Sequence, residues 1–223
     1  MNSNRTTTPI AMAERFRGYL PVVVDLETGG FDPVRNPILE VAAVQVRYAN
    51  GRLQPGERWV RAVEPFAGAV VEPAALKVTG IDPQDPDRGA LPEGTALKEM
   101  FRVIRTTLKE LSCTRAILVA HNAAFEQQFL NRATARNQLK RNPFHPFSFI
   151  DTASLAAVAL GHTVLSEACA RAQIAFDPNQ AHSALYDAER TAELFCAMVN
   201  GWDALRHLVP LPDPAWGPGS AAG

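Results

Sequence analysis

The run Val22-Val23-Val24-Asp25-Leu26-Glu27-Thr28-Gly29 is apolar and β-branched at its start and acidic at its end. β-Branched residues on both faces favour a buried strand at the centre of a sheet. Because side chains two apart on a strand share one face, Asp25 and Glu27 point the same way. Two carboxylates beside a valine-rich strand are costly unless a cation neutralises them, although the pair alone would also suit a strand end near solvent. We therefore predict a central strand over 20–27 with a candidate cation site at its end.

A second acidic segment is the run His121-Asn122-Ala123-Ala124-Phe125-Glu126. The apolar stretch 116–120 predicts a strand before it, and Asn122 is a good N-cap for a helix that runs to about Leu139. Glu126 would then lie in the first turn of this helix, where the helix dipole favours an acid whatever the function. The helix dipole alone is therefore enough to explain an acidic residue at position 126.

A third acidic segment extends from His182 to Asp187, at the start of a long helix expected over 183–205. Each segment is weak evidence alone, but three such segments can converge where strands end and helices begin. Two metal ions about 3.5–4 Å apart need a shared set of carboxylates of this kind. Oxygen ligands without cysteine favour Mg²⁺ or Mn²⁺ over zinc. Histidine titrates near neutrality, which suits His182 as a general base, so the three segments together predict a two-metal nuclease.

The composition excludes several classes of protein. The chain has 223 residues, of which 47% are hydrophobic and 20% charged, as in a globular protein with one sizeable core. A net charge of −1 provides no overall basic field, so any grip on nucleic acid must depend on a local patch. The three cysteines are far apart and form no C-x-x-C pair, which argues against a disulfide framework and a zinc site. Without an apolar signal segment or a stretch of about 20 apolar residues, we expect a soluble cytoplasmic protein.

The remaining pattern predicts one α/β domain over 12–208, between disordered segments 1–11 and 209–223. Two further strands, joined by an Asn50-Gly51 turn, would open the chain as an antiparallel meander. In chain order, the expected elements after residue 28 are strands at 38–48 and 57–64, a helix at 97–111, the strand and helix already named, a strand at 149–152, and helices near 152–160, 164–174 and 183–205. Strands first, then strands alternating with helices, indicate a mixed sheet flanked by helices.

The acidic segments resemble the three motifs of the DEDD exonuclease superfamily, in its histidine-containing branch. The motifs are Asp25-x-Glu27-Thr28-Gly29, His121-Asn122-x-x-Phe125 and His182-x-Ala184-x-x-Asp187-Ala188. Longer runs are similar to the ribonuclease T family: Arg15-Phe16-Arg17-Gly18, Gly80-Ile81-Asp82-Pro83, Arg141-Asn142-Pro143-Phe144-His145-Pro146-Phe147 and the segment from Gln180 to Asp187. The resemblance covers about residues 13–205. It implies an RNase H-like fold with a mixed five-stranded sheet, and a homodimer.

The resemblance also implies an activity. A member of this family would be a 3′→5′ exoribonuclease that releases 5′-monophosphates, with two Mg²⁺ per subunit and Mn²⁺ as a possible substitute. The implied substrates are the 3′ ends of tRNA and the precursors of 5S, 23S and other small stable RNAs, with single-stranded DNA as a secondary substrate. Asp25, Glu27, Glu126 and Asp187 would bind the metals, and His182 would be the general base.

Two groups of residues match nucleic-acid contacts of the family. Phe31, Phe125 and Phe147 match aromatics that sandwich the terminal bases, and stacking on an aromatic ring stabilises a bound base by about 1–3 kcal/mol. Core packing is an equally good explanation for the last two. The matching basic patch consists of Arg15, Arg17, Lys109, Arg115, Lys140 and Arg141. The resemblance implies that this patch on one subunit binds RNA that enters the active site of the other subunit. The alternative is a charged surface that only contacts solvent.

Four positions depart from the family pattern. Glu126 stands where the family has Asp, so its carboxylate lies one methylene farther from the backbone, and a displacement of about 1 Å can cost about a hundredfold in rate. Lys77-Val78 replaces an Ala-Phe pair, and Ala74 replaces a frequent acid; both changes bear on base preference at the 3′ end. Two alternatives stay open: a catalytically attenuated RNA-binding form, which Glu126 suggests, and a proofreading exonuclease subunit of a DNA polymerase, which shares the same motifs.

Overall fold

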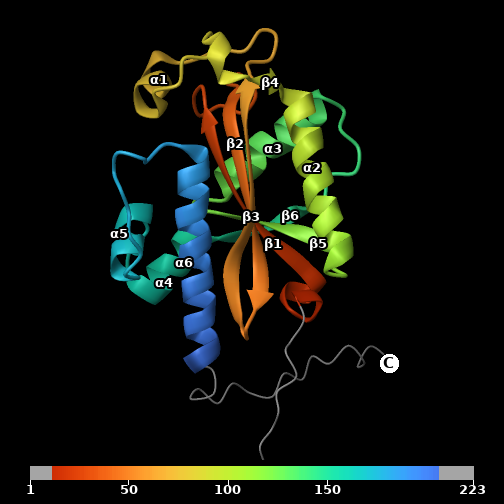
Figure 1. Cartoon of the computed structure of the whole chain (residues 1–223). Helices are drawn as coiled ribbons and strands as arrows, with labels where there is room; N and C mark the ends of the chain where they lie inside the picture. Colours follow the sequence, from red (N-terminus) through yellow and green to blue (C-terminus); the bar gives the residue numbers. More distant parts are fainter. Residues whose placement is uncertain (1–11, 206–223) are drawn as a thin grey trace, which may run out of the picture.

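A mixed, six-stranded sheet forms the middle of the protein (Figure 1), with strand order β4-β3-β2-β1-β5-β6. The computed structural model describes residues 12–205; the predictions of disorder for 1–11 and 209–223, and the domain end at 208, lie outside this range. The strands are β1 (Tyr19–Thr28), β2 (Ile38–Ala49), β3 (Arg52–Glu64), β4 (Leu91–Pro92), β5 (Arg115–Ala120) and β6 (Phe144–Asp151). β1, β2 and β3 form the antiparallel meander, and β5 and β6 continue the sheet in parallel with β1. The mixed α/β sheet is thus confirmed, and the two-residue β4 adds a sixth strand to the five expected.

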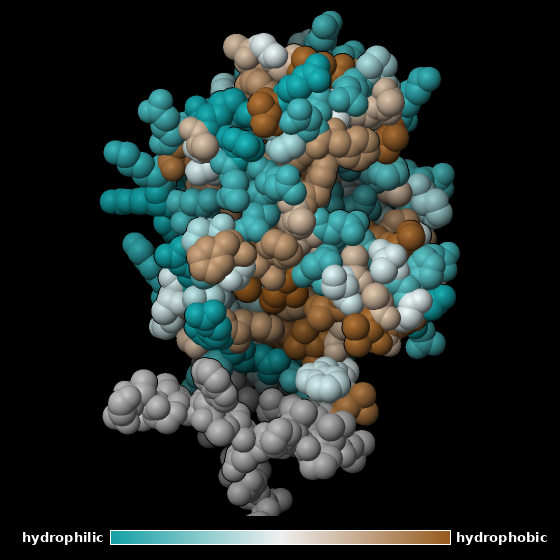
Figure 2. Space-filling view, turned by 180° about the vertical axis from the view of Figure 1, so that it is seen from behind, coloured by the Kyte–Doolittle hydropathy of each residue, from teal (hydrophilic) through white to brown (hydrophobic). Residues whose placement is uncertain are grey.

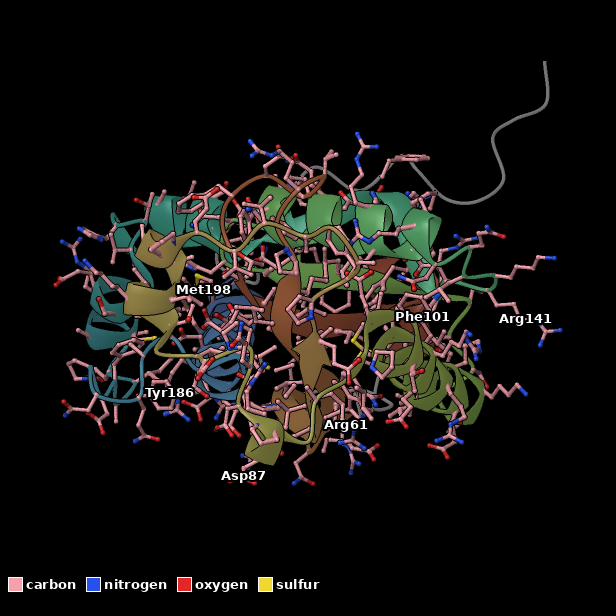
Figure 3. All side chains as sticks on the ribbon, turned by 90° about the horizontal axis from the view of Figure 1, so that it is seen from above. Arg61, Asp87, Phe101, Arg141, Tyr186 and Met198 are labelled. Carbon is pink, nitrogen blue, oxygen red and sulfur yellow. The ribbon has the colours of Figure 1, made fainter. Side chains whose placement is uncertain are left out.

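Helices cover both faces of the sheet. The helices are α1 (Pro73–Thr79), α2 (Glu93–Glu110), α3 (Ala124–Arg136), α4 (Thr152–Leu160), α5 (Leu165–Arg171) and α6 (Ala184–Leu205), with short 3-10 turns η1 (Met12–Glu14), η2 (Phe16–Gly18) and η3 (Pro86–Arg88). Seen from the front and from above, α2 and α6 lie on one side of the strands and α3 on the other (Figures 1 and 3). α6 packs across β1, β2 and β3, and α4 and α5 pack on α6.

Coverage on both faces explains the apolar sequence of β1. Leu20, Val22, Val23 and Val24 are completely buried, as expected for a central strand between two neighbours. The predicted apolar stripe of α2 faces the same core, and its Phe101 side chain lies on the inner side of the helix (Figure 3). Burial of these apolar side chains holds β1 in the middle of the sheet. The acidic side chains at the end of β1 therefore have a fixed position.

The start of α3 differs from the prediction. Asn122 was expected to cap the helix, but it adopts a left-handed backbone with φ of 72°, and Ala123 is the N-cap. The carboxylate of Asp151, at the end of β6, accepts the backbone N–H groups of Asn122 and Ala123 instead. A carboxylate from a neighbouring strand thus holds the turn before α3, and no side chain caps the helix itself.

Some features of the described residues bear on environment. Cys113, Cys169 and Cys196 are all buried and free. Between residues 12 and 205 no single helix is long and apolar enough to cross a membrane. Taken together, α4 and α5 have the length and composition of a membrane span, but they are bent by 41° at the break between them.

Candidate active site

The sheet topology brings the acidic segments to one end of the molecule. β1 and β5 run parallel, so the end of β1 that carries Asp25 and Glu27 lies beside the end of β5 that leads into α3. Glu126 and Asp187 stand in the first turns of α3 and α6. The four carboxylates are close enough to shift one another's pKa values. Acids that are separated by up to 162 positions in the sequence are therefore neighbours in the fold.

The two acids of β1 are held in an environment that disfavours their charge. The side chain of Glu27 is 7% exposed, and burial, followed by the charges of Asp187 and Glu40, raises its pKa to about 8. Burial also raises the pKa of Asp25 well above its ordinary value, and the nearby carboxylates of Glu126 and Glu27 raise it further. A divalent cation would reverse this penalty, because it supplies the missing positive charge.

Glu126 is almost completely buried at 5% exposure. Burial raises its pKa to about 8, with further contributions from the charges of Asp151 and Glu27, while a hydrogen bond from its own backbone N–H acts against the shift. Its Oε2 atom has no hydrogen-bond partner among the described residues. A buried carboxylate oxygen without a partner is costly, and a bound cation is the partner that the neighbouring acids favour.

His182 and Asp187 form a closed loop at the start of α6. The backbone N–H of His182 donates to Asp187 Oδ2 at 2.9 Å, and the N–H of Asp187 donates to the carbonyl of Ser183 at 3.0 Å. His182 has a left-handed backbone with φ of 64°, and its ring is exposed at the surface. Burial raises the pKa of Asp187, against the lowering effects of that hydrogen bond and of the His182 and His121 charges. The Oδ1 atom of Asp187, like Oε2 of Glu126, is buried without a partner among residues 12–205.

A metal ion fits this set of donors. One ligand atom each of Glu27, His182 and Asp187 lies within 4.8 Å of the others. Asp25 lies two residues before Glu27 on β1, and the charges of Glu126, Glu27 and Asp187 all contribute to its raised pKa. The oxygen-rich donor set suits Mg²⁺ or Mn²⁺, and two buried carboxylate oxygens have no hydrogen-bond partner within residues 12–205. The arrangement can therefore hold divalent cations next to an imidazole that is open to solvent.

Two of the three predicted stacking residues lie together. The ring of Phe31 is 84% exposed and meets Phe125 edge to face, with centroids 6.2 Å apart. Phe125 is half-buried and packs on Phe129 at 4.7 Å, so it combines a core contact with an open edge. Phe147, on β6, is 77% exposed and packs at 4.5 Å against His145 rather than against the other pair. Phe125 directly precedes Glu126 in the sequence, so the pair of rings offers a surface for a base near this acid.

The predicted basic residues lie at the opposite end of the sheet from the carboxylates. Arg115 begins β5 and pairs with Tyr19, the first residue of β1. At about 3.3 Å per residue, the eight steps from Tyr19 to Glu27 span roughly 26 Å. Arg15 forms an ion pair with Asp203 at 2.7 Å, whereas Lys109 and Arg17 are exposed. The remaining members, Arg115, Lys140 and Arg141, are exposed, and Arg141 extends away from the strands (Figure 3).

Two residues of the site were not predicted from the sequence. Glu40 on β2 is the partner of Glu27 in the strand register, and Asp151 fixes the turn before α3. The signal for Asp151 was its place before Thr152 and an apolar helix, which is typical of an N-cap. The signal for Glu40 was weaker: an acid within an apolar strand that had to pair with the strand of Glu27.

Comparison with known proteins identifies a family and several relatives. Residues 22–195 match the family model described as Exonuclease. The ribonuclease T of Marinobacter nauticus is 52% identical over 94% of this chain and 96% of its own length. The ribonuclease T of Hahella chejuensis is 56% identical over 92% and 93%, and that of Escherichia coli O157:H7 is 52% identical over 95% and 98%.

Solved structures show the same fold at lower identity. The nuclease domain of 3′hExo, a DEDDh family member bound to rAMP, superposes with a TM-score of 0.66 at 20% identity and covers 82% of this chain and 92% of its own. E. coli Exonuclease I in complex with a dT13 oligonucleotide gives a TM-score of 0.64 at 17% identity, over 85% of this chain and 43% of its own. These matches confirm the RNase H-like fold. Together with relatives above 50% identity over almost the whole chain, they establish that the protein belongs to the ribonuclease T family of 3′→5′ exoribonucleases.

Proposed function

We propose that this exoribonuclease holds two Mg²⁺ ions, with Mn²⁺ as a possible substitute, on Asp25, Glu27, Glu126 and Asp187, and that His182 is its general base. The observation that carries the proposal is the convergence of buried carboxylates with raised pKa values and two unpartnered oxygens. Only a strong positive charge makes such a cluster favourable in its charged form. When bound, the two ions supply activation of the attacking water and stabilisation of the leaving oxygen.

The protein's own groups divide the remaining work. The ring of His182 is exposed at the mouth of the cluster, where it accepts the proton of the attacking water. The carboxylate of Asp187 fixes the backbone of His182 by the 2.9 Å hydrogen bond, so the base keeps its place during turnover. Phe31 and Phe125 hold the terminal base of a single strand, because a duplex end would keep that base stacked on its neighbours. The product is a nucleoside 5′-monophosphate.

We propose the 3′ ends of tRNA and of the precursors of 5S, 23S and other small stable RNAs, in the cytoplasm, as the main substrates. Single-stranded DNA is the expected secondary substrate, since stacking and metal contacts do not need a 2′-hydroxyl. The exposed position of Phe31 supports a flexible single-stranded end as the ligand. Substitution at Lys77-Val78, on a helix without buried residues, removes one stacking ring of the family pattern, so we expect weaker discrimination between terminal bases.

We propose that the functional unit is a homodimer. Arg115, at the start of β5, lies roughly 26 Å along the strands from Glu27, so the basic patch is far enough from its own site to contact an RNA strand in a partner's site. An apolar groove of about 510 Å³ adjoins Arg15, lined mainly by side chains of β6, α4 and α6. Among its lining residues, Val158 is 89% and Trp202 53% exposed. Hydrophobic surface is gathered in the lower half of the rear face (Figure 2), and a second copy of the chain is the occupant that would place the basic patch near a foreign site.

Cleavage of a 5′-labelled single-stranded RNA in Mg²⁺ tests the proposed function. A ladder shortened from the 3′ end is expected for the wild type and is expected to be absent for Asp25→Asn, which keeps the shape of the side chain but loses its charge. Activity of purified, metal-saturated Asp25→Asn close to the wild-type rate would defeat the two-metal assignment. Chelation with EDTA should abolish the ladder, and added Mg²⁺ should restore it.

A further inference from the structure

Glu40 is an acidic residue that the proposed chemistry does not use, yet it stands beside the metal ligands. It pairs with Glu27 across β1 and β2, and residues directly opposite in an antiparallel pair point to the same face. Like charges in this position are destabilising. The charge of Glu40 contributes to the raised pKa values of Asp25 and Glu27. Among residues 12–205, no lysine, arginine or histidine forms an ion pair with it.

The contact of Glu40 is a long-range hydrogen bond to the start of α6. Its Oε2 atom accepts the backbone N–H of Ala184 at 2.9 Å, across 144 positions of the sequence. Ala184 is the first residue of α6 and is completely buried. The first N–H groups of a helix have no partner within the helix, and they form its positive end. Glu40 therefore caps α6 from a neighbouring strand.

The capped residue lies between the general base and a metal ligand. His182 precedes Ala184 by two residues and Asp187 follows it by three. The two ends of this loop are already joined by the hydrogen bond from the His182 N–H to Asp187 Oδ2. The bond from Ala184 to Glu40 then ties the whole loop to the strand next to Glu27. It sets the position of His182 and Asp187 relative to the carboxylates of β1.

We propose that Glu40 is a positioning residue for the exonuclease site: by accepting the Ala184 N–H, it holds the His182–Asp187 loop against β1. The inference rests on the proposed function, in which His182 is the base and Asp187 a metal ligand. For this role, the side chain at position 40 must be a hydrogen-bond acceptor of the right length, and it does not need a negative charge. Loss of the acceptor loosens the loop, and a displacement of about 1 Å at a reacting group costs about a hundredfold in rate.

The test compares Glu40→Met, which has similar length and no carboxylate, with Glu40→Gln, whose amide oxygen can accept the same N–H. Steady-state trimming of a labelled RNA in saturating Mg²⁺ gives kcat, and its dependence on RNA concentration gives KM. We expect Glu40→Met to lower the rate by about 10- to 100-fold with KM within about threefold of the wild type. Glu40→Gln should stay within about threefold in both. Glu57→Met, an exposed acid on β3, is the matched control and should change neither.

A second measurement does not depend on catalysis. Hydrogen exchange of the Ala184 amide in the full-length protein should accelerate in Glu40→Met and remain slow in Glu40→Gln. An unchanged rate in Glu40→Met, or equal losses in both variants, would overturn the proposal. Where Glu40→Met does not fold, Glu40→Asp, which withdraws the carboxylate by one methylene, replaces it. If the wild type trims no RNA, the proposed function fails, while amide exchange still decides whether Glu40 holds the loop.

Discussion

At the scale of the residue, Glu126 raises the most specific question. Its longer side chain reaches the acidic cluster from the first turn of α3, and its Oε2 atom is buried without a partner among the described residues. We predict that Glu126→Gln lowers the trimming rate at least a hundredfold, because a neutral amide cannot supply the charge that a cation needs. Glu126→Asp should remain within about tenfold of the wild type, with Glu110→Gln as an exposed control.

The outcome of the same assay separates two forms of the enzyme. A much faster Glu126→Asp variant would mean that the natural glutamate attenuates an otherwise intact site. A fully active Glu126→Gln variant would remove Glu126 from the metal ligands.

The raised pKa values predict how the stability of the metal-free protein depends on pH. Burial raises the pKa of Glu27 and of Glu126 from an ordinary value of 4.5 to about 8. Between these values the folded state binds more protons than the unfolded chain. The stability that these groups contribute is therefore fully present below pH 4.5 and is lost as the pH rises through about 8.

We expect the melting temperature in EDTA to fall from pH 5 to pH 8, as measured by differential scanning calorimetry. Added Mg²⁺ should raise it more at pH 8 than at pH 5, because protons compete with the ion for the carboxylates. Glu27→Gln should flatten the slope in EDTA. A melting temperature that rises over this range without metal would contradict the pKa shifts.

At the scale of the element, the sequence predicted what depends on periodicity. The apolar β-branched run of β1 and the helical spacing of α2 identified both elements to within a few residues. β3 was predicted to begin at Glu57, but the strand begins at Arg52 and includes Pro55. A register shift opposite Pro55 accommodates the proline, since it cannot donate to the ladder. Such a compensation depends on the neighbouring strand and has no local signal.

Prediction of the site had the same limit: local patterns could be recognised in the sequence, but long-range contacts could not. The acids with motif spacing could be chosen from the sequence, while the contacts that position them could not. Asp151 caps the turn before α3 and Glu40 caps α6 only because distant strands deliver them there. Likewise, α1 has no buried residue and hence no apolar periodicity that would reveal it.

The core face of α2 allows a quantitative prediction at this scale. Phe101 is 1% exposed and packs edge to face against Phe144 on β6. Phe101→Ala should lower the free energy of unfolding by about 3–5 kcal/mol, because it leaves a cavity that packed neighbours cannot fill. Lys98→Ala, on the exposed side of the same helix, should change it by less than about 0.5 kcal/mol. Urea unfolding in EDTA measures both, and equal effects would place Phe101 outside the cooperative core.

At the scale of the whole molecule, the basic patch and the carboxylates lie at opposite ends of the sheet. This separation predicts a dimer in which each active site uses the basic patch of the other subunit. Light scattering of the wild type should give twice the chain mass of 24.2 kDa. Val158→Asp, in the apolar groove, should give a monomer, because a buried charge at an interface is costly. Val78→Asp, on the exposed α1, should remain a dimer.

The monomer's activity should depend on substrate length. Val158→Asp should lose most activity on a long single-stranded RNA yet cleave a dinucleotide at close to the wild-type rate, because a dinucleotide is too short to reach the partner's patch. A wild-type monomer at assay concentration, or equal loss on both substrates, would refute the dimer.

The hydrogen bond between Glu40 and Ala184 also has a consequence for protein synthesis. It joins a strand made early to the last described helix, which carries His182 and Asp187. A chain that is still on the ribosome, without α6, has the acids of β1 and α3 but neither the base nor the final carboxylate. We therefore expect hydrolytic activity only after α6 has been synthesised and has docked on the sheet. We expect this order of synthesis to keep the growing chain from hydrolysing ribosomal RNA.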